Sequence, residues 1–178
     1  MVSAWTRQAG AAMSDEETQF ESADAGASDT IPVTAGSVRK GGHIVIKGKP
    51  CKVIDISTSK TGKHGHAKCK FVALNIFTGA KQEDMQPAGH NMSAPLVKKV
   101  EYSLMDITDD DYFCMMNESG DMKEDLQLLE GNEFIGDMHK KIREAFNESQ
   151  ENGDKEIMVT VLCAMGQEMV IDFKAINV

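Results

Sequence analysis

Short apolar runs broken by glycine and proline turns fill the chain from residue 31 onward. In the first half, the strand-like runs are 43–47, 51–56, 68–77 and 81–86. Turn signals around Gly48 and Gly79 separate these runs, and no helical period connects them. Alternating runs of this length predict β-strands, and short strands joined by tight turns predict a small β-barrel.

Alternation along these runs predicts which side chains face the core. In the run 51–56 it places Asp55 on the same face as Cys51 and Val53, with Ile56 on the opposite face.

The second half has the same strand-like texture with one helix inserted. Its strand-like runs are 101–107, 112–116, 122–128, 156–164 and 169–176. Between the third and fourth runs, residues 133–147 carry apolar side chains at helical spacing, and Asn132 can serve as their N-cap. Three strands, a helix and two strands form the element order of the OB barrel. The predicted fold is mainly β, with two small barrels and one helix.

Charge is divided unevenly along the chain, although the net charge is −9. Residues 1–30 are acidic and poor in large apolar side chains, so we expect a disordered segment in which residues 1–12 are either an upstream extension or a remnant of cloning. Residues 31–98 carry eleven Lys/Arg against three Asp/Glu, whereas residues 99–178 carry seven against nineteen. We expect two domains at these limits, and the basic one offers a face for nucleic acid.

The four cysteines are scattered and form no Cys-x-x-Cys pair, so we expect buried free thiols and no zinc site: Cys51, Cys69, Cys114 and Cys163. No run of about eighteen apolar residues is present, which argues against a membrane-spanning helix. The N-terminus does not resemble a secretory signal. We therefore expect a cytoplasmic protein without a membrane partner.

The segment 57–68 between two strand-like runs is the most informative part of the chain. It is basic, contains no acid, and has no large apolar residue that could anchor it. We expect a long hairpin loop, and loops of that length tend to be functional. Gly62 and Gly65 permit a tight turn around Lys63, which would then lie at the tip. Cations without compensating carboxylates are available to phosphates, so the loop is a candidate RNA contact.

Three other interpretations of this loop are weaker. A phosphate-binding P-loop requires glycine at position 57 and a following helix, whereas Ser57 and a strand are present. His64 and His66 supply only two metal ligands, fewer than the usual three or four. A catalytic lysine needs a depressed pKa, which an exposed tip does not provide. We expect neither a bound metal nor catalytic residues.

The loop sequence Ser-Thr-Ser-Lys-Thr-Gly-Lys-His-Gly-His-Ala-Lys resembles the signature of the eukaryotic translation initiation factor 5A family throughout. Similar stretches include 38–40, 48–52, 76–79, 89–92, 124–126 and 159–165. The resemblance therefore runs from about Met13 to the C-terminus. It implies an SH3-like N-terminal barrel followed by an OB domain.

The resemblance also implies a function for the loop. In this family one lysine, matched here by Lys63, is converted to hypusine from spermidine by deoxyhypusine synthase and deoxyhypusine hydroxylase. The chain would be their substrate, and not itself an enzyme, with no bound cofactor. The modified arm would contact the acceptor end of peptidyl-tRNA on the ribosome and promote peptide-bond formation at stalling sequences such as proline runs, as well as elongation and termination.

The remaining loop residues would support the loop or contact ribosomal RNA and tRNA. The candidate binding residues are Lys60, Thr61, Gly62, Lys63, His64, Gly65, His66 and Lys68. An alternative is a general single-stranded RNA-binding module without a role specific to the ribosome. That alternative predicts salt-sensitive RNA binding with little dependence on Lys63.

Overall fold

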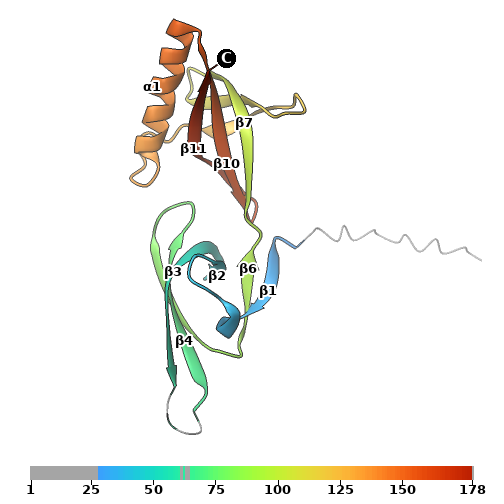
Figure 1. Cartoon of the computed structure of the whole chain (residues 1–178), viewed down its shortest axis with the longest axis vertical. Helices are drawn as coiled ribbons and strands as arrows, with labels where there is room; N and C mark the ends of the chain where they lie inside the picture. The colour runs from blue at the N-terminus through green and yellow to red at the C-terminus, as the bar shows by residue number, and fades with distance from the viewer. Residues whose placement is uncertain (1–27, 61, 63–64, 178) are drawn as a thin grey trace, which may run out of the picture.

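The computed structural model describes residues 28–60, 62 and 65–177, and almost all of its regular structure is β (Figure 1). We call the first six strands the N-terminal domain. They are β1 (Thr30–Thr34), β2 (His43–Ile46), β3 (Lys49–Lys60), β4 (Ala67–Asn75), β5 (Lys81–Pro87) and β6 (Asn91–Pro95), with a 3-10 turn at Ala35–Ser37. The other elements form the C-terminal domain. They are β7 (Lys98–Ile107), β8 (Tyr112–Met116), β9 (Met122–Gln127), α1 (Gly136–Asn152), β10 (Lys155–Ala164) and β11 (Gln167–Asn177). The mainly β prediction is confirmed.

The N-terminal domain combines an antiparallel sheet in the order β2-β3-β4-β5 with a two-stranded ribbon of β1 and β6. Its core includes Ile44, Cys51, Val53, Phe71 and Ala73, all almost fully buried. The sequence runs for β2 to β5 are confirmed. The strands β1 and β6 were missed, because proline and polar residues hide the alternation in both. Most of the expected disordered segment lies outside the described residues, and Thr30 already belongs to β1.

The predicted face pattern of β3 is wrong beyond Val53. The pairing of β3 with β4 shifts register between Val53 and Asp55, which is a β-bulge. The extra residue exchanges the two faces, so Asp55 is exposed and Ile56 packs against the core. Simple alternation cannot anticipate a bulge, since the sequence carries no glycine there to mark it.

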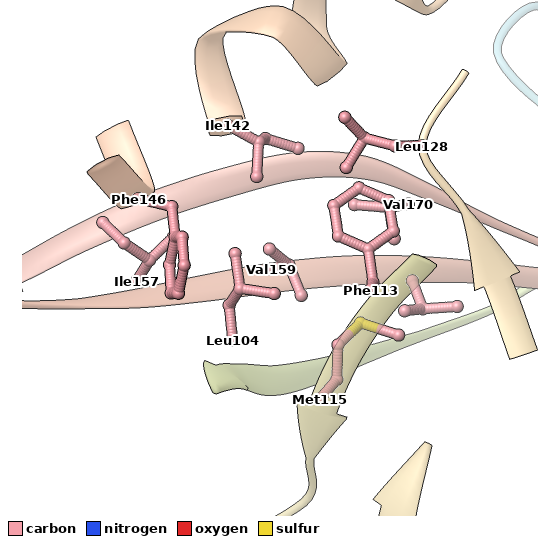
Figure 2. Packing of buried hydrophobic residues seen from close by; sticks show 10 residues of the cluster. Leu104, Phe113, Met115, Leu128, Ile142, Phe146, Ile157, Val159 and Val170 are labelled. Carbon is pink, nitrogen blue, oxygen red and sulfur yellow. The ribbon is translucent and has the colours of Figure 1, made fainter. Parts of the chain in front are cut away.

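The C-terminal domain is a five-stranded antiparallel sheet in the order β11-β10-β7-β8-β9. The outer strands β9 and β11 also approach each other, which curls the sheet toward a barrel. Figure 2 shows side chains from α1 and the strands meeting in one core, with Ile142 and Phe146 of the helix packed over Phe113, Val159 and neighbouring residues. This arrangement confirms the predicted OB-type order.

The helix begins three residues later than predicted and extends further, to Asn152. Asn132 does not cap it. The Asn132 side chain accepts hydrogen bonds from the backbone N–H groups of Phe134 and Ile135, at 2.8 and 3.2 Å, and so closes the turn before the helix. Asparagine stabilises turns and helix starts through the same type of bond, which is why the sequence suggested the earlier start.

The cysteine prediction is correct in one respect and wrong in another. All four cysteines are free thiols, and Cys51 and Cys69 are buried. Cys114 and Cys163 are only partly buried, and each thiol donates a hydrogen bond to a neighbouring carboxylate, that of Glu124 and Glu168 respectively. Burial, followed by the Glu168 hydrogen bond, raises the pKa of Cys163 to about 11, so the thiol remains protonated.

The two domains meet at a small apolar cluster. Phe77, from the turn after β4, packs with Ile135 and with Leu162 and Ala164 of β10. In the same turn, a Cβ atom at Gly79 would lie 2.4 Å from Cδ2 of the Phe134 ring, and Gly79 has a φ of +68°. Gly79 therefore allows the Phe134 ring to rest directly on the backbone of the other domain. This close contact was not visible in the sequence.

One histidine is fully enclosed by the C-terminal domain. The Nδ1 atom of His139 accepts a hydrogen bond from the Leu129 N–H at 2.7 Å, and Nε2 lies 2.9 Å from the Val170 carbonyl oxygen. Both contacts require a neutral ring protonated at Nε2. Burial lowers the pKa of His139, although the Val170 hydrogen bond and the charge of Glu130 oppose this effect.

Among the described residues, no helix is both long and apolar enough to cross a membrane.

Replacing Gly79 by alanine tests the contact between the domains. A positive φ costs a residue with a Cβ about 1–2 kcal/mol, and at Gly79 the Phe134 ring must also move. Gly120→Ala is the matched control, because Gly120 has a φ of +88° and no atom within 4 Å of the added Cβ. In urea unfolding, Gly79→Ala should lower the free energy of unfolding more than Gly120→Ala does. Equal losses in the two variants would contradict the contact.

The buried His139 predicts a pH dependence of stability. Its pKa is lowered in the folded state, so the unfolded chain takes up the proton more readily. Above the unfolded-state pKa of about 6.5, the His139 ring is neutral in both states, and its contribution to the free energy of unfolding is fully present. As the pH falls below this value and through the folded-state pKa of His139, the free energy of unfolding should decrease. Thermal unfolding between about pH 5 and 8 should show this loss in the native chain and a flatter profile in His139→Gln. Parallel profiles would show that His139 does not titrate with folding.

Candidate functional site: the β3–β4 hairpin

The basic segment singled out by the sequence forms the end of the β3–β4 hairpin. In Figure 1 this hairpin points away from the C-terminal domain and ends at the opposite pole of the molecule from α1. Its base is fixed by the N-terminal core, where Cys51 of β3 pairs with Asn75 of β4. The pairing continues without a further register shift from Asp55 to Lys60, which pairs with Ala67.

The loop is shorter than predicted. Ser57 to Lys60 pair with Lys70 to Ala67, so both ends of the expected 57–68 loop belong to strands. Small hydroxyl residues have moderate strand preference and carry no apolar alternation, which explains why the sequence suggested a loop. As a result, Lys60 and Lys68 are held on paired backbone, and only residues 61–66 connect the strands.

Two glycines are positioned at the turn. Gly62 has a φ of +71°, as expected for a tight turn, and the Gly65 N–H lies 3.4 Å from the Gly62 carbonyl oxygen. The predicted site residues Thr61, Lys63 and His64 lie outside the described residues. Their roles therefore remain predictions.

The hairpin extends beyond the core that anchors it. Cys69 is the last buried residue of β4 on the inner face, and Thr58, which pairs with it, is already exposed. Beyond this point, the side chains of β3 and β4 have no second layer to pack against. Lys60 continues the inner face, whereas Lys68 lies on the outer face. Cations are thus presented on both sides of the projecting end.

One carboxylate neutralises two lysines lower in the sheet, whereas the two lysines near the tip have no such partner in the described part of the chain. Glu83 of β5 pairs with Lys81 at 2.8 Å and with Lys70 at 3.1 Å, and these contacts lower the pKa of Glu83. Within the described residues, neither Lys60 nor Lys68 has a carboxylate within 4.0 Å of its ammonium nitrogen. The positive charge near the tip is therefore available to an external anion.

The described residues do not gather into a metal site. They contain no group of three or more His, Cys, Asp or Glu side chains that could hold an ion. His66 is exposed, and its proposed partner in the metal interpretation, His64, lies outside the described residues. Hence, the hairpin offers a projecting cationic surface suited to phosphate contacts.

Family models match both domains. The model described as "Translation initiation factor 5A-like, N-terminal" matches residues 28–90, and "Eukaryotic elongation factor 5A hypusine, DNA-binding OB fold" matches residues 96–174. The second description agrees with the OB-type order of the C-terminal sheet.

Curated relatives extend over nearly the whole chain. "Eukaryotic translation initiation factor 5A-1" of Saccharomyces cerevisiae is 51% identical over 162 residues, covering 91% of this chain and 96% of the relative. "Eukaryotic translation initiation factor 5A" of Dianthus caryophyllus is 48% identical over 166 residues, covering 93% of this chain and 98% of the relative.

Solved structures agree with these sequence matches. A translation initiation factor of this family from Naegleria fowleri matches with a TM-score of 0.71 and 42% identity, covering 83% of this chain and 99% of the other. Eukaryotic translation initiation factor 5A from Methanococcus jannaschii matches with a TM-score of 0.61 and 26% identity, covering 83% of this chain and 96% of the other. With both domains matched in order and about half of the residues identical to curated relatives, the chain belongs to the eukaryotic translation initiation factor 5A family of translation factors.

Proposed function

We propose that this translation factor acts on the ribosome through a hypusine side chain at Lys63, which contacts and positions the acceptor end of peptidyl-tRNA. The observation that carries the proposal is the projecting β3–β4 hairpin, whose uncompensated Lys60 and Lys68 flank the segment that contains Lys63. Family membership adds support, because the matching family model carries hypusine in its description.

The modification gives the hairpin a longer reach. Deoxyhypusine synthase, using NAD, transfers the aminobutyl group of spermidine to Nζ of Lys63, and the rest of spermidine leaves as 1,3-diaminopropane. Deoxyhypusine hydroxylase then adds a hydroxyl with oxygen taken from dioxygen. A lysine offers one compact charge on a four-carbon stem. The modified arm has a second amine and a hydroxyl, and it can therefore reach further and donate more hydrogen bonds.

The proposed contribution to peptide-bond formation is one of positioning. Holding the acceptor end of peptidyl-tRNA reduces the freedom that it must lose before reaction, and such ordering can supply a large part of a barrier. The benefit should be greatest at stalling sequences such as proline runs, and it should extend to elongation and termination. Bond formation itself remains with the ribosome, so the factor needs no catalytic residue or bound cofactor.

The paired strands lower the conformational entropy that the hairpin would lose on binding. A flexible basic loop would lose conformational entropy on ordering at the ribosome, whereas backbone hydrogen bonds already fix Lys60 and Lys68. These two lysines and His66 would contact RNA phosphates on either side of the hairpin.

Lys63→Arg tests the central residue. Arginine keeps the positive charge but cannot receive the aminobutyl group at a lysine Nζ. With modified protein and purified ribosomes, the variant should lose nearly all stimulation of a proline-run template while its affinity for bulk single-stranded RNA stays unchanged. If stimulation persists, the proposal fails. Retained stimulation together with an unchanged RNA affinity would favour the general RNA-binding alternative, which predicts little dependence on Lys63.

Lys60→Gln with Lys68→Gln tests the phosphate contacts of the hairpin. Each lost phosphate contact should reduce the slope of log affinity against log salt by about 0.7–0.9. The double variant should therefore bind ribosomes more weakly, with a slope lower by about 1.5. Lys81→Gln is a matched control from the same sheet, because Glu83 already neutralises Lys81. If Lys81→Gln changes the slope as much as the double variant does, the contacts are not specific to the tip.

A further inference from the structure

A second feature, remote from the hairpin tip, is an apolar pocket between the two domains. It encloses about 330 Å³, which lies within the range of small-molecule sites. Both domains contribute apolar walls, through Ile54, Leu74, Ile76, Phe134, Leu162 and Ile171.

Part of this wall is unusually exposed for such large apolar side chains. Phe134 is 47% exposed and Ile54 is 38% exposed, although both line a concave surface. Clustered exposed apolar side chains around a hollow are typical of a binding site. Burying them against an apolar group would release water from both domains at once.

Three basic residues contribute to the lining of the pocket. His43, Lys52 and Lys99 line it, and no carboxylate is among the lining residues. His43 and Lys52 are directly opposite each other in the β2–β3 pairing. Burial is the main cause of the lowered pKa of His43, and the charges of Lys52 and Lys99 lower it further, as expected if the three groups converge. In the described part of the chain, neither lysine has a carboxylate within 4.0 Å of its ammonium nitrogen.

The polar groups of the pocket favour an anion over a hydrogen-bonding ring such as a nucleobase. Asn75 is the one neutral amide in the lining. Its Oδ1 already accepts hydrogen bonds from the N–H groups of Phe77 and Thr78, at 2.8 and 3.2 Å. A nucleobase would therefore bury polar edges without adequate partners, which is costly. A tail without polar atoms avoids that cost.

We propose that the pocket between the domains binds a carboxylate with an unbranched apolar tail of about ten carbons, its headgroup held by Lys52 and Lys99. The tail length follows from the volume, since a water-sized group occupies about 30 Å³. Two ammonium groups complement the two oxygens of one carboxylate, with the apolar walls from both domains around the tail. Because both domains contribute, the bound ligand resists their separation.

The proposal is tested with decanoate and the full chain, below the micelle concentration of the ligand. Titration followed by amide NMR shifts should saturate, with changes confined to residues around the pocket. Decanol, which has the same tail but no charge, should bind at least tenfold more weakly. Hexanoate, which keeps the charge but shortens the tail, should also bind at least tenfold more weakly.

The headgroup assignment is tested by Lys52→Gln with Lys99→Gln. This double variant should lose at least tenfold in decanoate affinity and should no longer distinguish decanoate from decanol. Lys140→Gln with Lys141→Gln is the matched control, because it removes two exposed lysines of α1 away from the pocket. The control should bind decanoate like the native chain.

Three results would overturn the proposal. They are the absence of saturable binding, shifts centred away from the pocket, and equal weakening in the pocket and control double variants. The proposal does not depend on the function of the hairpin, so Lys63→Arg should bind decanoate like the native chain. Unfolding curves for each variant establish that a lost affinity does not reflect a lost fold.

Discussion

The antiparallel pairing of β3 with β4 supports both the core of the N-terminal domain and the site at its tip. At one end, Cys51 and Phe71 are buried, and the strands are fixed by apolar contacts. At the other end the same pairing continues past the core to Lys60 and Ala67. The anchored and projecting parts therefore belong to the same two strands.

Charge is distributed unevenly between the hairpin and the rest of the chain. The chain as a whole is acidic, and Glu83 neutralises Lys70 and Lys81 along the sheet. Among the described residues, Lys60 and Lys68 near the tip have no such partner, so this end of the hairpin can attract phosphate. The C-terminal half is acidic, and charge of that sign repels phosphate.

The sequence predicted most of the architecture, because most strands here alternate cleanly. It missed the bulge after Val53, since a register shift depends on the partner strand and leaves no mark in one segment of sequence. It placed the helix start too early because Asn132 makes the same kind of bond in a turn as at a helix cap. The strand pairing of residues 57–60 could not be predicted, because polar strands without an apolar face have the same sequence pattern as loops.

The candidate site residues could be identified from the sequence, but the strands that hold them were known only from the structure. The twelve-residue signature identified the family, and the structure then showed that Lys60 and Lys68 belong to strands. The pocket between the domains had no sequence signal, because its wall combines Ile54, Phe134 and Ile171 from distant segments. Only tertiary structure brings such residues together.

The most direct test of the central claim is peptide mapping by mass spectrometry of the protein purified from its own cells. The peptide containing Lys63 should carry the added mass of an aminobutyl group plus one hydroxyl oxygen, with fragment ions that place the addition on Lys63 and not on Lys60 or Lys68. A peptide in which Lys63 is an ordinary lysine would show that the hairpin does not act through hypusine.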